Sequence, residues 1–107
     1  IVAGAQCHIV FNLCVSNGAG GNGAGIHAVQ ASNRIEGNNC TGADRGIDVD
    51  AAGNFIIRNS CSANTVNFSV VAGNAFYAVP AAASASANGS SGGTPYGTSV
   101  PDANFSY

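Results

Sequence analysis

Apolar and polar residues alternate in short segments along the chain, and this alternation predicts strands. In the segments Ile26 to Ala28, Ile47 to Val49 and Phe68 to Val70 the apolar residues stand two positions apart. An amphipathic helix would repeat them every three or four positions instead. Residues of Asn, Gly, Ser and Ala separate these segments. The pattern therefore predicts an all-β chain of short strands without a substantial helix.

The same pattern recurs with a period of 21 residues, which lies in the range of solenoid repeats. Residues 25–45 align with residues 46–66. A third copy follows and is one residue short, and a degenerate copy precedes them, ending in a Gly-rich insertion at 17–24 that we expect to be a loop. The matched columns are Gly25/Gly46, Ile26/Ile47, Ala28/Val49, Asn33/Asn54, Ile35/Ile56, Asn38/Asn59 and Cys40/Cys61.

A repeat of this length, with short strands bent at Gly and Asn, is typical of one coil of a parallel β-helix. Such coils stack about 4.8 Å apart, so equal positions lie above one another. We predict about three to four coils over residues 1–80, followed by an irregular, low-complexity cap over 81–107. A β-sandwich also uses short alternating strands, but it gives no reason for Asn and Cys to repeat at one period. The expected interior residues are Ile26, Ile35, Ile47, Ile56, Phe68 and Phe76.

Asparagine and cysteine occupy further columns of the repeat. Stacked side-chain amides can hydrogen-bond from coil to coil, so we expect two ladders: Asn12, Asn38 and Asn59, and Asn33, Asn54 and Asn74. A third column holds Cys14, Cys40 and Cys61, while Cys7 falls near the position of Asn33. Neighbouring coils are close enough for a disulfide, but free thiols packed as small apolar groups also explain the column. We expect mostly reduced cysteines with at most one bridge, and no metal site, because no Cys-x-x-Cys pair is present.

The segments GIHAVQASNRIEGN at 25–38 and GIDVDAAGNFIIRN at 46–59 resemble the coils of right-handed parallel β-helix proteins of the NosD-like and pectate-lyase-like superfamily. The ending, with Gly73-Asn74 and the run from Pro101 to Tyr107, resembles the closing segment of many secreted bacterial β-helix repeat proteins. Members of this superfamily are typically several times longer, so the chain resembles their C-terminal coils and cap, or an unusually short relative. The resemblance implies an all-β, right-handed parallel β-helix. It implies no single activity, because the superfamily includes lyases, hydrolases and proteins of no assigned activity.

The amino-acid composition argues against some classes of binding partner. Only 7% of the residues are charged and three arginines are the only permanent cations, so the cationic surface that nucleic acid requires is missing. No apolar run reaches the length of about 18 residues that a membrane span needs. The sequence contains no Met, so we expect Ile1 to mark a processing site or the edge of a fragment. Four cysteines and abundant Asn, Ser and Gly favour an extracellular, cell-surface or periplasmic location.

Two groups of polar residues invite a catalytic interpretation. His27, Asp48 and Ser69 share an outward column, but the carboxylate stands in the middle, where a hydrolase triad needs the imidazole. Asp48, Asp50 and Arg45 are the candidates for the Ca²⁺ and polysaccharide contacts that the likeness to polyuronate lyases implies. Neighbouring coils carry no carboxylate at the equivalent positions, so a solvated polar face is expected there. We predict no catalytic residue, no metal and no cofactor.

A short stack of coils has two open ends, each exposing strand N–H and C=O groups together with apolar core. The segment after Val79 can cover one end, as capping repeats do in solenoids. At the other end, either further coils precede Ile1 or another copy docks. We therefore predict a non-catalytic, structural, self-associating extracellular protein, as a filament ahead of a closed oligomer. The alternative is a polysaccharide-binding or polysaccharide-lyase fragment that acts through the face carrying Asp48 and Asp50.

Overall fold

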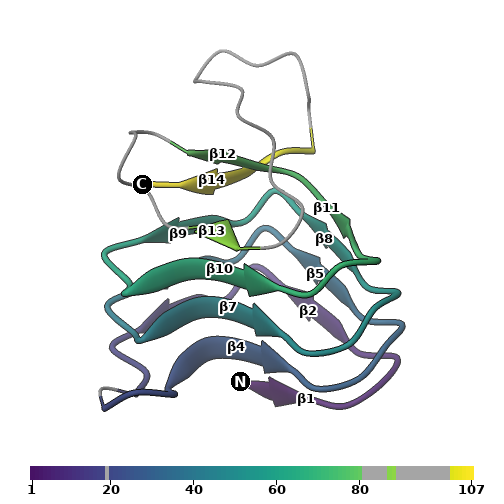
Figure 1. The fold of residues 1–107 in the computed structure, drawn as a ribbon, viewed down its shortest axis with the longest axis horizontal. Coiled ribbons are helices and arrows are strands. Elements are labelled where there is room, and N and C mark those ends of the chain that lie inside the picture. The colour runs from purple at the N-terminus through teal and green to yellow at the C-terminus, as the bar shows by residue number, and fades with distance from the viewer. Residues whose placement is uncertain (19, 81–86, 89–101) are drawn as a thin grey trace.

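The computed structural model describes residues 1–18, 20–80, 87–88 and 102–107, and these form strands and turns without a helix (Figure 1). The strands assemble into three sheets. Sheet A contains β1 (Val2–Ala3), β4 (Ala24–Ala28), β7 (Arg45–Val49), β10 (Val66–Val70) and β13 (Ala87–Asn88). Sheet B contains β2 (His8–Val10), β5 (Arg34–Glu36), β8 (Phe55–Ile57) and β11 (Ala75–Phe76). Sheet C contains β3 (Leu13–Val15), β6 (Asn39–Thr41), β9 (Ser60–Ser62), β14 (Asn104–Ser106) and β12 (Ala78–Pro80).

Each full repeat of the sequence adds one strand to each sheet. Ile47 pairs with Ile26 on one side and with Phe68 on the other, and the described strand pairs are all parallel. Positions 21 residues apart therefore lie side by side, and Figure 1 shows β1, β4, β7 and β10 stacked in chain order. The predicted all-β class is confirmed, and the three parallel sheets are consistent with a parallel β-helix or another solenoid.

One hydrophobic core joins the three sheets. Five of the six residues predicted to lie inside are completely buried: Ile26, Ile35, Ile47, Ile56 and Phe68. Burial of one such side chain contributes about 1.5–3 kcal/mol. Phe76 is only partly buried, because its strand β11 is the last one of sheet B, and its ring packs at a centroid distance of 5.3 Å from Phe68.

Corners with left-handed backbone separate the strands at equivalent positions of the repeat. Between sheets B and C the corner residues are Phe11, Gly37 and Arg58, with φ angles of 54°, 66° and 57°. Glycine adopts this conformation freely, whereas other residues lose about 1–2 kcal/mol. Packing and hydrogen bonds must therefore hold Phe11 and Arg58 in place. The repeated corner returns the chain to the same sheet in each repeat.

Strand β14, near the C-terminus, lies inside sheet C. It pairs with β9 on one side and with β12 on the other, although β12 precedes it in the chain (Figure 1). Ala87–Asn88 likewise forms a short strand against β10. These two strands correct the expectation of irregular structure over 81–107 for the residues concerned. The rest of that expectation concerns 81–86 and 89–101, which lie outside the described residues.

Candidate functional site

The longest side-chain ladder among the described residues runs along the start of sheet C and consists of Asn12, Asn38, Asn59 and Asn104. The Oδ1 of each later member accepts hydrogen bonds from both the backbone N–H and the Nδ2 of the member before it, at 2.8–3.0 Å. The last three members are at most 1% exposed. The ladder thus satisfies backbone donors inside the molecule at a corner between strands. Asn104 is the member that the repeat period did not indicate.

The ladder of Asn33, Asn54 and Asn74 is built differently. Each Oδ1 accepts a hydrogen bond from the backbone N–H of the equivalent residue one repeat earlier, which for Asn33 is Cys7. Each Nδ2 donates to the carbonyl three residues earlier in its own repeat. The amides therefore bond to backbone groups rather than to one another, and they close a turn in every repeat.

The cysteine column lies against the core on sheet C. Cys40 pairs in register with Cys14 and with Cys61, and all three side chains are buried as free thiols. Burial raises the pKa of the Cys14 and Cys61 thiols above their usual range. A raised pKa lowers the thiolate fraction and therefore the reactivity. Cys7 is a partly exposed free thiol outside this column.

A polar cluster of His27, Arg45, Asp48 and Asp50, here called the sheet A cluster, lies on the outer face of sheet A. His27 Nε2 lies 2.8 Å from Asp50 Oδ2 and 3.8 Å from Asp48 Oδ2. Arg45 Nη1 lies 2.7 Å from the same oxygen of Asp48. One ligand-type atom from each of His27, Asp48 and Asp50 lies within 4.8 Å of the other two. The structure thus brings together residues of two groups that the sequence analysis treated separately. His27 belonged to the possible triad, and Asp50 belonged to the possible calcium and polysaccharide contacts.

Burial within the sheet A cluster is uneven. Asp48 is 2% exposed, so the expectation of a solvated polar face is wrong at this residue. The reason is that the short Asp48 side chain, in the middle of sheet A, is flanked by the longer side chains of Arg45 and His27. The side chain of Asp50 is 56% exposed. Ser69 lies opposite Asp48 in register, which leaves the carboxylate between the imidazole and the hydroxyl.

Asp44 ties the Gly-rich loop to the corner before sheet A, an interaction that the sequence did not indicate. Its Oδ2 accepts hydrogen bonds from the backbone N–H groups of Gly21 and Gly23, at 2.8 and 3.0 Å. These hydrogen bonds, above all that from Gly23, hold the pKa of Asp44 below its usual range. The carboxylate therefore stabilises the part of the loop that leads into β4.

An ion-pair chain crosses the outer face of sheet B. Arg58 places Nη1 2.8 Å from Glu36 Oε1 and Nη2 2.7 Å from Asp102 Oδ1. Arg34 Nε lies 2.7 Å from Glu36 Oε2, and this hydrogen bond is the main cause that lowers the pKa of Glu36. These ion pairs link β5 to the corner residue after β8 and to the residues just before β14.

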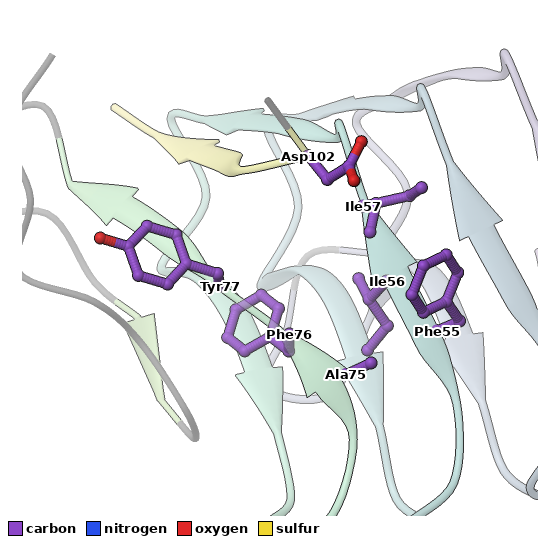
Figure 2. Close-up of a pocket in the computed structure, with 7 residues that line it drawn as sticks. All are labelled: Phe55, Ile56, Ile57, Ala75, Phe76, Tyr77 and Asp102. Atoms are coloured by element: carbon purple, nitrogen blue, oxygen red, sulfur yellow. The ribbon is translucent and has the colours of Figure 1, made fainter. Parts of the chain in front are cut away.

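Beside this chain, sheet B carries an open hollow of about 180 Å³ (Figure 2). Figure 2 shows the rings of Phe55 and Tyr77 on either side, Ile56 and Phe76 between them, and Asp102 near Ile57. Most of the lining is apolar, and Asp102 contributes the carboxylate. The lining residues are Phe55, Ile56, Ile57, Ala75, Phe76, Tyr77 and Asp102.

The N-terminal edge of the molecule, formed by β1, β2 and β3, is a candidate surface besides the sheet A cluster and the sheet B hollow. Each of these strands is the first of its sheet and pairs with a described strand on one side only. Exposed apolar side chains gather there, among them Val2 at 77%, Phe11 at 80% and Leu13 at 70% exposure. An unpaired strand edge that carries apolar side chains is a template for further pairing.

No helix in the described part of the chain is both long and apolar enough to cross a membrane. No family model, curated protein or solved structure matches the sequence or the fold of this chain.

Proposed function

We propose that the chain is a non-catalytic structural protein with the right-handed parallel β-helix fold, and that its copies associate through the N-terminal edge. The three parallel sheets and their constant register support this fold. Connections between parallel strands of one sheet are right-handed in about 98% of cases, which supports the handedness. Resemblance to NosD-like and pectate-lyase-like proteins, through residues 25–38 and 46–59, agrees with the same fold.

The observation that carries the proposal is the incomplete Asn ladder at the N-terminal edge. Asn38, Asn59 and Asn104 each accept two hydrogen bonds at Oδ1 from the preceding member. Asn12 has no preceding member among the described residues, so its Oδ1 has the capacity to accept the same two hydrogen bonds. A strand laid against β2 and β3 supplies N–H donors in this direction. The N-terminal edge therefore offers a side-chain hydrogen-bond acceptor to a further strand, in addition to its unpaired strand edges.

Some backbone groups of β2 also face the N-terminal edge. Cys7 O accepts from Arg34 N–H, and Phe11 N–H donates to Glu36 O. Because a parallel strand directs alternate residues to its two sides, the N–H and C=O groups of His8 and Val10 face the open edge. Another chain that adds a strand here gains backbone hydrogen bonds and covers Phe11 and Leu13.

Among the described strands, β12 is the last of sheet C at the opposite edge, and it contains Pro80. Proline has no N–H, and its presence on an edge strand discourages further pairing. This asymmetry favours the pairing of two N-terminal edges about a two-fold axis, since head-to-tail stacking would have to use the edge with Pro80. We therefore propose a second copy of this chain as the partner, in a closed oligomer rather than the filament expected from the sequence.

The proposed location is extracellular or cell-surface, and its support is compositional: few charges, four cysteines and abundant Asn, Ser and Gly.

A polysaccharide-binding role is the alternative function. The observation in its favour is the sheet B hollow, where Phe55 and Tyr77 offer ring surfaces beside the carboxylate of Asp102. Binding of soluble polysaccharides that is lost in Phe55→Ala, with the oligomeric state unchanged, would establish it.

Light scattering over a range of concentrations tests the association. We expect a mass above 10.5 kDa that falls on dilution. Leu13→Lys, which adds a charge at the proposed interface, and His8→Pro, which removes an edge N–H, should both give monomers. Val71→Lys is the matched control, because it also places a lysine at an exposed aliphatic position but lies after β10, away from this edge.

Stable monomers of the wild-type chain at every concentration would refute the proposal. Equal dissociation by Val71→Lys would also refute it, because the effect would then come from charge alone. A regular fibre in electron microscopy would support self-association but overturn the closed form.

A further inference from the structure

The sheet A cluster brings together three metal-ligating side chains from two neighbouring repeats. His27 lies on β4, Asp48 lies opposite it on β7, and Asp50 follows β7 by one residue. The ligand-type atoms are His27 Nε2 and one carboxylate oxygen from each Asp, all within 4.8 Å of one another. They lie on the outer face of the sheet, where the side chains of His27 and Asp50 are 31% and 56% exposed. An ion can therefore reach His27 and Asp50 from solvent, whereas the Asp48 side chain is only 3% exposed.

The distances between these atoms suit a single small cation. Zinc binds imidazole nitrogen and carboxylate oxygen at about 2.0–2.2 Å, which places neighbouring tetrahedral ligands about 3.4 Å apart. His27 Nε2 lies 2.8 Å from Asp50 Oδ2 and 3.8 Å from Asp48 Oδ2, so the observed distances lie on either side of that value. Bringing these two distances to that value requires side-chain shifts of about 0.4–0.6 Å, and the third pair, Asp48 with Asp50, lies within 4.8 Å.

Arg45 fits this arrangement as a supporting residue. Its Nη1 hydrogen-bonds Asp48 Oδ2 at 2.7 Å and fixes the orientation of a carboxylate that is almost completely buried. Carboxylate ligands of metal sites are commonly held in this way by a further hydrogen bond. An ionised carboxylate has about four lone-pair positions, so Asp48 can accept from Arg45 and still bind a cation. Together the cation, Arg45 and the two carboxylates give a local charge near +1, instead of −1 without the cation.

The donor set decides the class of ion. Calcium and magnesium prefer oxygen ligands, and calcium takes six to eight of them. One imidazole nitrogen with two carboxylate oxygens is typical of zinc and of neighbouring divalent transition metals. We propose that His27, Asp48 and Asp50 form a binding site for a divalent transition-metal ion, zinc above all, which links adjacent repeats and leaves a fourth position open to solvent.

The two histidines of the chain make a direct test feasible. The protein is prepared with Cys7→Ser, because the partly exposed thiol of Cys7 would compete for zinc. Zinc chloride is then added while the imidazole nitrogens are observed by long-range ¹H–¹⁵N NMR. We expect a change at Nε2 of His27 that saturates at one ion per chain, with His8 unchanged. Calcium chloride at the same concentration should leave both rings unchanged.

Variants in the same background identify the ligands. His27→Gln and Asp50→Asn change exposed side chains and should weaken zinc binding by at least about tenfold. Asp102→Asn is the matched control, since its side chain is comparably exposed at 44% but lies beside sheet B, and its affinity should equal that of the parent. Zinc should also raise the thermal midpoint of the parent and not that of His27→Gln, because an ion that binds only the folded state stabilises it.

Three results would overturn the proposal: no change at His27, a change confined to His8, or equal affinity in the parent and Asp50→Asn. A response to calcium as strong as that to zinc would overturn the assigned class of ion. The circular dichroism spectrum of each variant shows whether it keeps its strands, so lost binding can be separated from lost structure.

Discussion

Truncation of Asn38 should destabilise the protein far more than truncation of its neighbour Asn39. The Asn38 side chain makes four hydrogen bonds, each at 2.9 Å: two accepted from Asn12 and two donated, to Ile9 O and Asn59 Oδ1. Asn38→Ala removes all four at a site with 1% exposure. At about 1 kcal/mol for each bond, the free energy of unfolding should fall by about 4 kcal/mol.

Two further variants provide reference values for this change in the free energy of unfolding. Asn39→Ala changes an exposed residue of β6 and should alter the free energy of unfolding by less than about 0.5 kcal/mol. The Asn12 side chain, at the open end of the ladder, donates two hydrogen bonds, to Val10 O and Asn38 Oδ1. Asn12→Ala should therefore cost about 2 kcal/mol, half the value for Asn38.

Urea unfolding followed by circular dichroism measures these differences. With an m-value of about 1–2 kcal/mol/M, Asn38→Ala should lower the midpoint by about 2–4 M. Since domains of this size are stable by about 5–15 kcal/mol, the variant should keep about 1 kcal/mol or more and remain mostly folded in the absence of urea. If Asn38→Ala and Asn39→Ala differ by less than about 1 kcal/mol, the buried ladder does not stabilise the fold as argued.

Two other predictions concern titration and thiol reactivity. Because the folded protein holds the pKa of Asp44 below its usual range, the stability it contributes should be complete above the unfolded pKa of about 3.9 and disappear as the pH falls through the lowered value. The stability difference between wild type and Asp44→Asn should thus shrink on acidification, and a difference that grows in acid would contradict this. In native protein, iodoacetamide should modify Cys7 first and the three buried cysteines only after unfolding. Mass spectrometry counts the modified thiols, and a mass unchanged by reductant would show that no disulfide is present.

The fold was largely predictable because a repeat in sequence becomes a repeat in space when strands pair in parallel. The 21-residue period specifies which residues lie side by side, so the pairing of Ile35 with Ile56 and of Cys40 with Cys61 follows from alignment alone. Alternation with a period of two then specifies which residues point inward. The prediction of a buried Phe76 was too strong, because a residue on the last strand of a sheet lacks a covering neighbour.

The outer surface was harder to predict, since period and register describe strands and not the bends after them. Register places His27 opposite Asp48, yet the shortest contact of the imidazole is to Asp50, two residues further on. Asp50 lies just beyond β7, and its position depends on how the chain bends there. The sequence also assigned Asp48 to solvent, whereas the side chains of Arg45 and His27 flank it and little of it is exposed.

Local alternation and a fixed period were enough to predict the strands of the repeats, their register, the core columns and the first three members of the Asn12 ladder. That Asn104, 45 residues after Asn59, completes this ladder follows only from the folded arrangement. The folded arrangement also decided that β14 enters sheet C between β9 and β12. A strand that returns from far along the chain is placed by the hydrogen bonds and core surface left open to it, and no period in the sequence records that choice.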